Sequence, residues 1–215
     1  MTTTGPVAPP KRDWNDKVNR GVYRLASHWL ALVNLFFGLY VGLPLLAPVL
    51  MNAGRTTPAR LIYAIYRPAC HQRPERSYFL DGPKVAYTPQ ELEAAGVRVG
   101  LFSRDIGNAA VGWKVAFCER DVAIYGSIFL GGLAYGLLRR RRGKWLMRFR
   151  YYLVFVVPMG MDGVLQLFGL YESTWLLRTL TGTWFGLGSV AFAYPYLDEA
   201  FRDIRYGLER RLRQG

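Results

Sequence analysis

A cysteine and a histidine stand side by side at Cys70 and His71, in a chain that has only two residues of each type. The second cysteine is Cys118, and Asp121 follows it three positions later. Two thiols, an imidazole and a carboxylate are ligands that suit tetrahedral zinc. The sequence therefore predicts a candidate metal site formed by Cys70, His71, Cys118 and Asp121, with a transition metal such as zinc as the cofactor.

The same two cysteines allow two other interpretations. Thiols tend to oxidise outside the cytoplasm, and a disulfide between Cys70 and Cys118 would stabilise the fold by about 2 to 4 kcal/mol. A redox-active thiol pair is the third interpretation. The spacing is not that of a zinc finger, so the sequence leaves all three open.

Ionisable and polar residues also occur inside apolar stretches. Asp162 lies near the middle of the stretch 151–170, where a charged side chain costs about 2.5 to 3.5 kcal/mol, and Gln166 shares its helical face. Arg178 is expected to reach toward Glu172 or, through water, toward Asp162. Asp162, Gln166 and Arg178 are therefore catalytic candidates, for example in a proton relay. The alternative is a buried hydrogen bond that locks helices together.

Arginines near these groups are candidates for binding an anion. Arg76 follows the Cys-His pair, Arg120 lies between Cys118 and Asp121, and Arg178 enters the last apolar stretch. We expect Arg76, Arg120 and Arg178 to lie at one side of the membrane with the thiols, around a pocket that opens outward.

Four apolar stretches must position these residues. The first has no charged residue in 25 positions, which is long enough for a helix to cross a hydrocarbon core of roughly 30 Å. The three others are flanked by Arg, Trp or Tyr, as interfacial anchors should be. The sequence predicts an all-α integral membrane fold, a four-transmembrane-helix bundle with an outward-facing loop cap and interfacial helices at its periphery. The expected spans are about 26–50, 122–138, 151–170 and 174–197.

The distribution of positive charge predicts the orientation. Segments 1–25, 139–150 and 198–215 hold 17 of the 28 Lys and Arg residues, and the positive-inside rule places such segments in the cytoplasm. We therefore expect a multi-pass protein of the inner (cytoplasmic) membrane with both termini cytoplasmic. Its parts are a tail 1–25, a membrane domain 26–197 that includes an outer cap 51–121, and an amphipathic tail 198–215 along the inner membrane surface.

The net charge of +13 would usually favour nucleic acid as a partner, but the topology accounts for it. We therefore expect the lipid bilayer as the partner, with other membrane subunits as a further option and no nucleic acid.

Within the cap, three local signals predict structure. Residues 57–70 carry a helical stripe too short to span a membrane. Thr88, Pro89, Glu91 and Gly96 are typical of the N-cap, first turn and end of a short helix. Residues 112–118 are predicted to form a strand that leads into the second span.

Three motifs carry a resemblance to a known family. CHQRPERSYF at 70–79, Cys118 followed by ERDVAIYG, and MDGVLQLFGLYESTWLLRTLTG at 161–182 together resemble a prokaryotic family of predicted membrane proteins called domain of unknown function 2085. The resemblance covers most of residues 60–195 and implies an integral membrane protein without an assigned activity. Asp121 stands where the family motif, similar to C-x-R-C, has its second cysteine, and residues 81–116 resemble an insertion.

Two classes of function follow. In the first, the pocket is a metal- or thiol-dependent site that acts on a small molecule, lipid or quinone at the outer surface. In the second, the protein is a non-catalytic accessory or assembly subunit of a membrane complex, stabilised by a Cys70–Cys118 disulfide.

Overall fold

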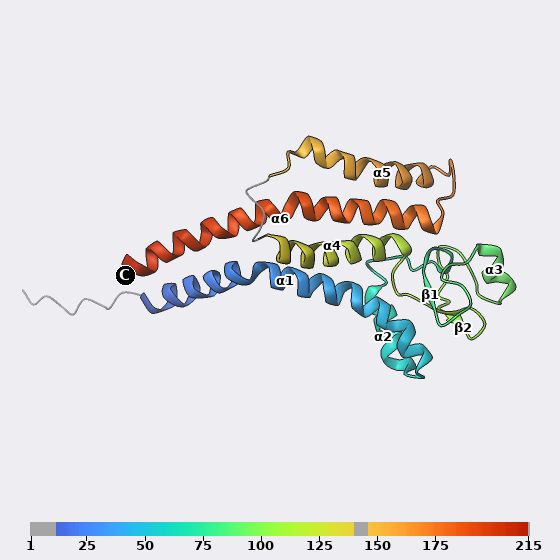
Figure 1. Ribbon diagram of the computed structural model, residues 1–215. Helices are drawn as coiled ribbons and strands as arrows, with labels where there is room; N and C mark the ends of the chain where they lie inside the picture. Colours follow the sequence, from blue (N-terminus) through green and yellow to red (C-terminus); the bar gives the residue numbers. More distant parts are fainter. Residues whose placement is uncertain (1–11, 140–145, 215) are drawn as a thin grey trace, which may run out of the picture.

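A computed structural model describes residues 12–139 and 146–214 of the chain (Figure 1). The tail residues 1–11 and most of the arginine run 139–142, both expected in the cytoplasm, lie outside the described residues. The described chain is mostly helical, as predicted. Its α-helices are α1 (Arg12–Asn52), α2 (Thr56–Tyr66), α3 (Pro89–Ala94), α4 (Glu119–Leu138), α5 (Phe149–Leu167) and α6 (Trp175–Gln214), and a single 3-10 turn covers Pro74–Arg76.

Two of the described helices are long and apolar enough to cross a membrane. They are the part of α1 from Asp16 to Asn52 and the whole of α4. Helices α5 and α6 overlap the third and fourth predicted stretches, but they are not among the described helices whose length and mean hydropathy suit a membrane span. The structure therefore supports two spans, while the four-span bundle stays a prediction.

The four long helices lie side by side, in the order α1, α4, α6, α5 (Figure 1). Glycines allow the close approach of α4 to its neighbours. A Cβ atom at Gly186 of α6 would lie 2.0 Å from the Ser127 hydroxyl and 2.6 Å from the Ile124 carbonyl oxygen, and one at Gly132 of α4 would lie 2.1 Å from Asn34 of α1. Small residues thus set the spacing of these helices.

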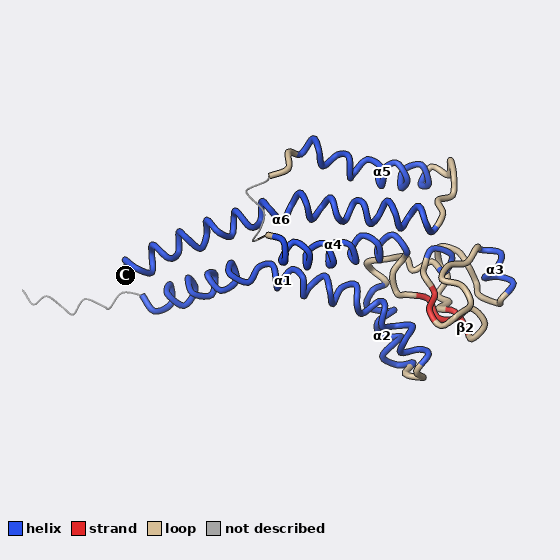
Figure 2. Tube along the Cα trace, viewed as in Figure 1, coloured by secondary structure: helices blue, strands red, loops and turns tan. Residues whose placement is uncertain are grey.

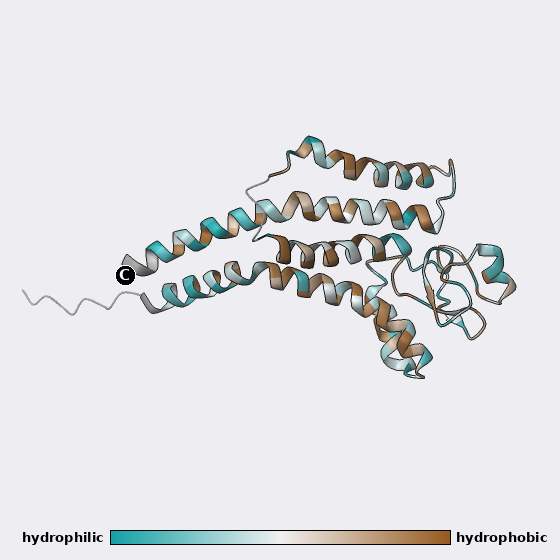
Figure 3. Cartoon of the chain, in the orientation of Figure 1, coloured by the Kyte–Doolittle hydropathy of each residue, from teal (hydrophilic) through white to brown (hydrophobic). Residues whose placement is uncertain are grey.

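Helices α1 and α6 continue past the ends of α4 and α5 as a pair that we call the stalk, residues 14–29 and 198–210 (Figure 1). Trp29 stacks on Phe201, and the Tyr23 hydroxyl donates to Glu209 over 3.0 Å. Hydrophilic residues are frequent in the stalk, whereas hydrophobic residues dominate the part beside α4 (Figure 3). The segment 198–214, expected to be an amphipathic tail, continues α6 without a break, and its position along the membrane surface stays a prediction.

The cap contains a small three-stranded antiparallel sheet (Figure 2). Strand β3 (Gly112–Lys114) is central and pairs with β1 (Phe79–Leu80) and β2 (Gly107–Asn108). Gly112 has a φ of 81°, and a Cβ atom there would lie 2.2 Å from the Leu80 carbonyl oxygen. Only glycine fits this position, so it fixes the strand that leads to Cys118.

The local helix signals of the cap are confirmed. In α3 the Thr88 side chain accepts from the Glu91 N–H, the Glu91 side chain accepts from the Thr88 N–H, and Pro89 occupies the first turn. Gly96 follows with a φ of 79°. Residues 56–66 form α2, and the predicted strand is present over 112–114.

A proline in α1 docks the cap onto the bundle. Pro48 has no N–H, so the Pro44 carbonyl oxygen four residues earlier has no helical donor. The Ala116 N–H donates to that oxygen over 3.2 Å, and both prolines are fully buried. This bond lies two residues before Cys118, in a core that also contains Tyr63, Tyr66 and Phe117 of α2 and the cap.

Candidate functional site

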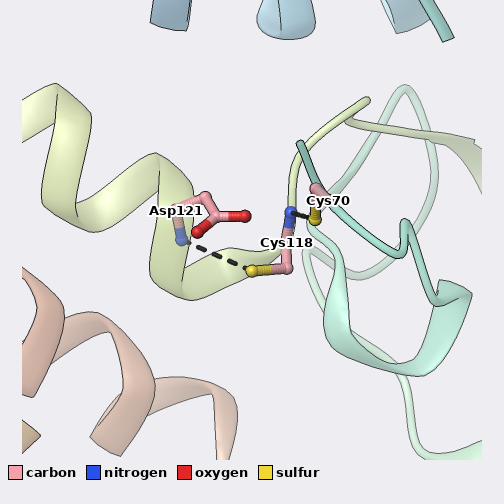
Figure 4. Close-up of side chains that lie close together, drawn as sticks. All are labelled: Cys70, Cys118 and Asp121. Carbon is pink, nitrogen blue, oxygen red and sulfur yellow. Dashed lines mark hydrogen bonds between the residues drawn. The ribbon is translucent and has the colours of Figure 1, made fainter. Parts of the chain in front are cut away.

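The two cysteines meet where α2 ends and α4 begins, although they are 48 residues apart in sequence. Cys118 is the N-cap of α4, and its sulfur accepts from the Asp121 N–H over 3.4 Å. Cys70 follows α2, and its sulfur accepts from the Cys118 N–H over 3.3 Å. Figure 4 shows the side chains of Cys70, Cys118 and Asp121 close together at the start of α4.

The Cys70 and Cys118 sulfurs and one Asp121 oxygen all lie within 4.8 Å of one another. Both cysteines are free thiols; Cys70 is buried and Cys118 is half-buried. His71 is not part of this cluster in the described structure. Its side chain is exposed, although it lines a cavity that Cys70, Cys118 and Asp121 also line. The next residue, buried Gln72, has a φ of 52° and donates to the Tyr63 carbonyl oxygen, so the backbone turns sharply beside His71.

The thiols differ in acidity. A hydrogen bond with Cys118, together with a backbone N–H, lowers the pKa of Cys70 although burial opposes this. The same contact, burial and the Asp121 charge raise the pKa of Cys118 well above its ordinary value. Cys70 is therefore the first thiol to ionise, and a thiolate is the form that binds metals and attacks electrophiles.

Lys114 is a buried cation that the sequence analysis did not single out. Its side chain is 1% exposed and donates to the Gln72 carbonyl oxygen. Burial lowers the pKa of Lys114 to about 8, and the charge of Cys70 opposes that shift. Lys114 thus holds the turn after His71 through the Gln72 carbonyl, and its positive charge interacts with Cys70.

Most of the predicted site residues line one cavity of ≈ 480 Å³ between the cap and the ends of α4, α5 and α6 that face the cap. From the cap, the α4 N-terminus, α5 and α6, the structure brings together Cys70, His71, Arg76, Cys118, Arg120, Asp121, Gln166 and Arg178. We call this cavity the outer pocket. Asp162 does not line it.

Two ion pairs hold the wall of the outer pocket, and one differs from the prediction. Arg178 pairs with Glu119 at 2.9 Å, not with Glu172 or Asp162, because Glu119 of α4 faces it inside the bundle. Asp162 is 3% exposed and accepts from Arg120 and from the Tyr171 hydroxyl. Asp162 therefore joins α5 to α4 and orients Arg120.

Glu119 and Tyr171 were missed by the sequence analysis. The run of three charged residues at 119–121, at the start of an apolar helix, was the available signal, because charges at such a place need partners. For Lys114 the sequence offers no comparable signal, since a lysine in a short strand is usually exposed.

Comparison with known proteins shows what part of the chain is similar to a described family. Residues 109–192 match a family model described as "Predicted membrane protein (DUF2085)", which confirms the resemblance predicted from the motifs. The matched part contains α4, α5 and α6 as far as residue 192, but not the motif at 70–79.

One curated relative matches over most of its length. It is an uncharacterized protein of Methanocaldococcus jannaschii, 26% identical over 180 residues that make up 81% of this chain and 96% of the relative. No solved structure matches the chain.

Proposed function

We propose that this membrane protein binds a transition metal such as zinc in the outer pocket, through Cys70, Cys118 and Asp121. The observation that carries the proposal is the cluster of two sulfurs and one carboxylate oxygen within 4.8 Å. Three protein ligands with a fourth position open to a pocket are typical of catalytic rather than structural zinc. His71, exposed at the same pocket, or a water molecule would supply the fourth ligand.

We further propose that α1, α4, α5 and α6 all cross the inner membrane, with the cap outside and both termini in the cytoplasm. Large apolar side chains that are exposed on α5 and α6 support this: Leu153, Val154, Val157, Met161, Val164, Leu176, Leu180, Trp184 and Leu187. Lipid is the solvent that suits such a surface. The metal site would then act on a small molecule at the outer membrane surface.

The metal content of purified protein tests the proposal. Wild-type protein should hold roughly one equivalent of metal per chain with two free thiols, and Cys118→Ser should lose it, because thiolate is the stronger ligand. Asp121→Asn should bind the metal more weakly, and Asp81→Asn, which changes an exposed cap residue, should keep it. Metal-free wild type with both thiols oxidised would overturn the proposal.

His71→Ala then identifies the fourth ligand. Loss of metal in this variant would assign His71 to the site, and retention would assign the position to water or substrate.

The same contact between sulfurs favours a second candidate function. If Cys70 and Cys118 oxidise, the disulfide would fasten the cap to α4, and the protein would be a non-catalytic subunit of a membrane complex. Counting thiols with and without reductant separates the two candidates. A stoichiometric partner after purification in mild detergent would support the second.

A further inference from the structure

The wall of the outer pocket has hydrogen-bond donors that the described chain leaves without partners. The Nε atoms of Arg120 and Arg178 and the Nε2 atom of Gln166 are buried and unpaired within the described residues, and all three residues line the pocket. A buried donor without a partner costs about 1 to 3 kcal/mol. Three of them at one cavity indicate a ligand rich in acceptor oxygens.

The charges around the pocket indicate the sign of that ligand. Arg178, whose side chain is 10% exposed, has one carboxylate partner, Glu119, and Arg120 has one, Asp162. Arg76 forms no salt bridge within the described chain. Burial and the charges of Arg73 and Arg178 lower its pKa, and the charges of Glu75 and Glu172 partly oppose this. Cations that repel each other around a cavity favour an anion between them.

Asp121 is the acidic residue among those that line this pocket, and its charge opposes an anion. In the proposed metal site Asp121 and the two thiolates are metal ligands, and a divalent cation offsets two of their three negative charges. The anion would then face arginines on one side and the metal on the other.

We infer that the outer pocket binds a phosphate group, either free or as the head of a lipid. Arg120, Gln166 and Arg178 line the cavity from α4, α5 and α6, and Arg76 lines it from the cap. A phosphate offers oxygens on several sides, where a carboxylate offers two. Leu101 and Leu167, 49% and 82% exposed, line the same pocket and provide an apolar surface beside the donors. The inference rests on the proposed function for the placement of this pocket at the membrane surface.

Binding of two phosphate probes to the detergent-purified full chain tests the inference. Inorganic phosphate should bind saturably, and Arg76→Gln and Gln166→Leu should each raise the Kd about tenfold or more, because a hydrogen bond to a charged group is lost. Arg98→Gln is the matched control, since Arg98 is exposed, pairs with Asp105 and does not line the pocket. Both test residues lack salt bridges in the described chain, so the variants should fold.

The second probe, phosphatidic acid in mixed micelles with phosphatidylcholine as control, distinguishes the sources. Tighter binding of phosphatidic acid assigns the site to a lipid head group, and equal binding assigns it to free phosphate. No saturable binding of either probe, or an unchanged Kd in both variants, overturns the inference.

Metal content measured in the same samples separates the two proposals. Arg76→Gln should retain the metal while losing phosphate affinity. Bound metal without phosphate binding would support the metal site and overturn the phosphate site. Phosphate binding without bound metal would support the phosphate site and overturn the metal site.

Discussion

Cys70 and Cys118 share a hydrogen bond but are expected to react at different pH. Because the Cys118 thiol lowers the pKa of Cys70 and its own pKa is raised, Cys70 keeps its thiolate as the pH falls, while Cys118 loses its thiolate at higher pH. In metal-free, reduced protein we therefore expect iodoacetamide to modify Cys70 at a lower pH than Cys118. Peptide mass spectrometry at several pH values measures this order.

Cys118→Ala provides the control for this prediction. Without the neighbouring thiol, the pKa of Cys70 should rise toward its ordinary value of about 8.5, so modification of Cys70 should require a higher pH than in the wild type. Preferred modification of Cys118 in the wild type would contradict the assigned acidity.

At this scale the sequence predicted which residues gather but not how they pair. Cys70, Cys118 and Asp121 were expected to be close, and the structure clusters them. Arg178 was assigned to the wrong carboxylate, because a partner on another helix depends on helix rotation, which no local pattern encodes. His71 was expected among the ligands, but the left-handed turn at Gln72 leaves it outside the cluster.

Among the elements, the crossing of α4 and α6 depends on glycine. Gly186→Ala should destabilise the protein by about 1 to 3 kcal/mol, because the new methyl group would overlap the Ile124 carbonyl and the Ser127 hydroxyl. Gly126→Ala, in α4 with nothing within 4 Å of its Cβ position, should be neutral or stabilising by up to about 1 kcal/mol. The thermal unfolding temperature in detergent compares the two variants, and equal temperatures would contradict the close crossing.

Helices were predictable where the signal is local. The four apolar stretches coincide with α1, α4, α5 and α6, and the capping residues of α3 act as expected. The continuation of α1 and α6 into the stalk was not predicted, because it depends on contacts between the two helices, such as Trp29 with Phe201, and not on the composition of either tail. Likewise, the hydrogen bond from the Ala116 N–H to the Pro44 carbonyl oxygen was not predicted. It depends on Pro48 of α1, which leaves that oxygen without a helical donor, and on the position of the cap.

For the whole molecule, the number of membrane spans determines on which side of the membrane the turn between α5 and α6 lies. In a Cys70→Ser/Cys118→Ser background, single cysteines at Arg104→Cys in the cap and Glu172→Cys in that turn should react with an impermeant maleimide in intact cells. Gly207→Cys in the stalk should react only after permeabilisation. If α1 and α4 alone cross, Glu172→Cys would be protected together with Gly207→Cys, and the four-span topology would be wrong.

The length of helix α6 couples the pocket to the far end of the molecule. Its 40 residues extend over roughly 60 Å, about twice the thickness of a bilayer core. Arg178 at one end belongs to the outer pocket, and Glu209 near the other end holds Tyr23 of α1. A tilt of the Arg178 end about Pro195, the proline inside the helix, would displace the Glu209 end. The separation of residues 23 and 209 would then report on changes at Arg178, and in the proposed four-span topology it would do so from the opposite membrane face.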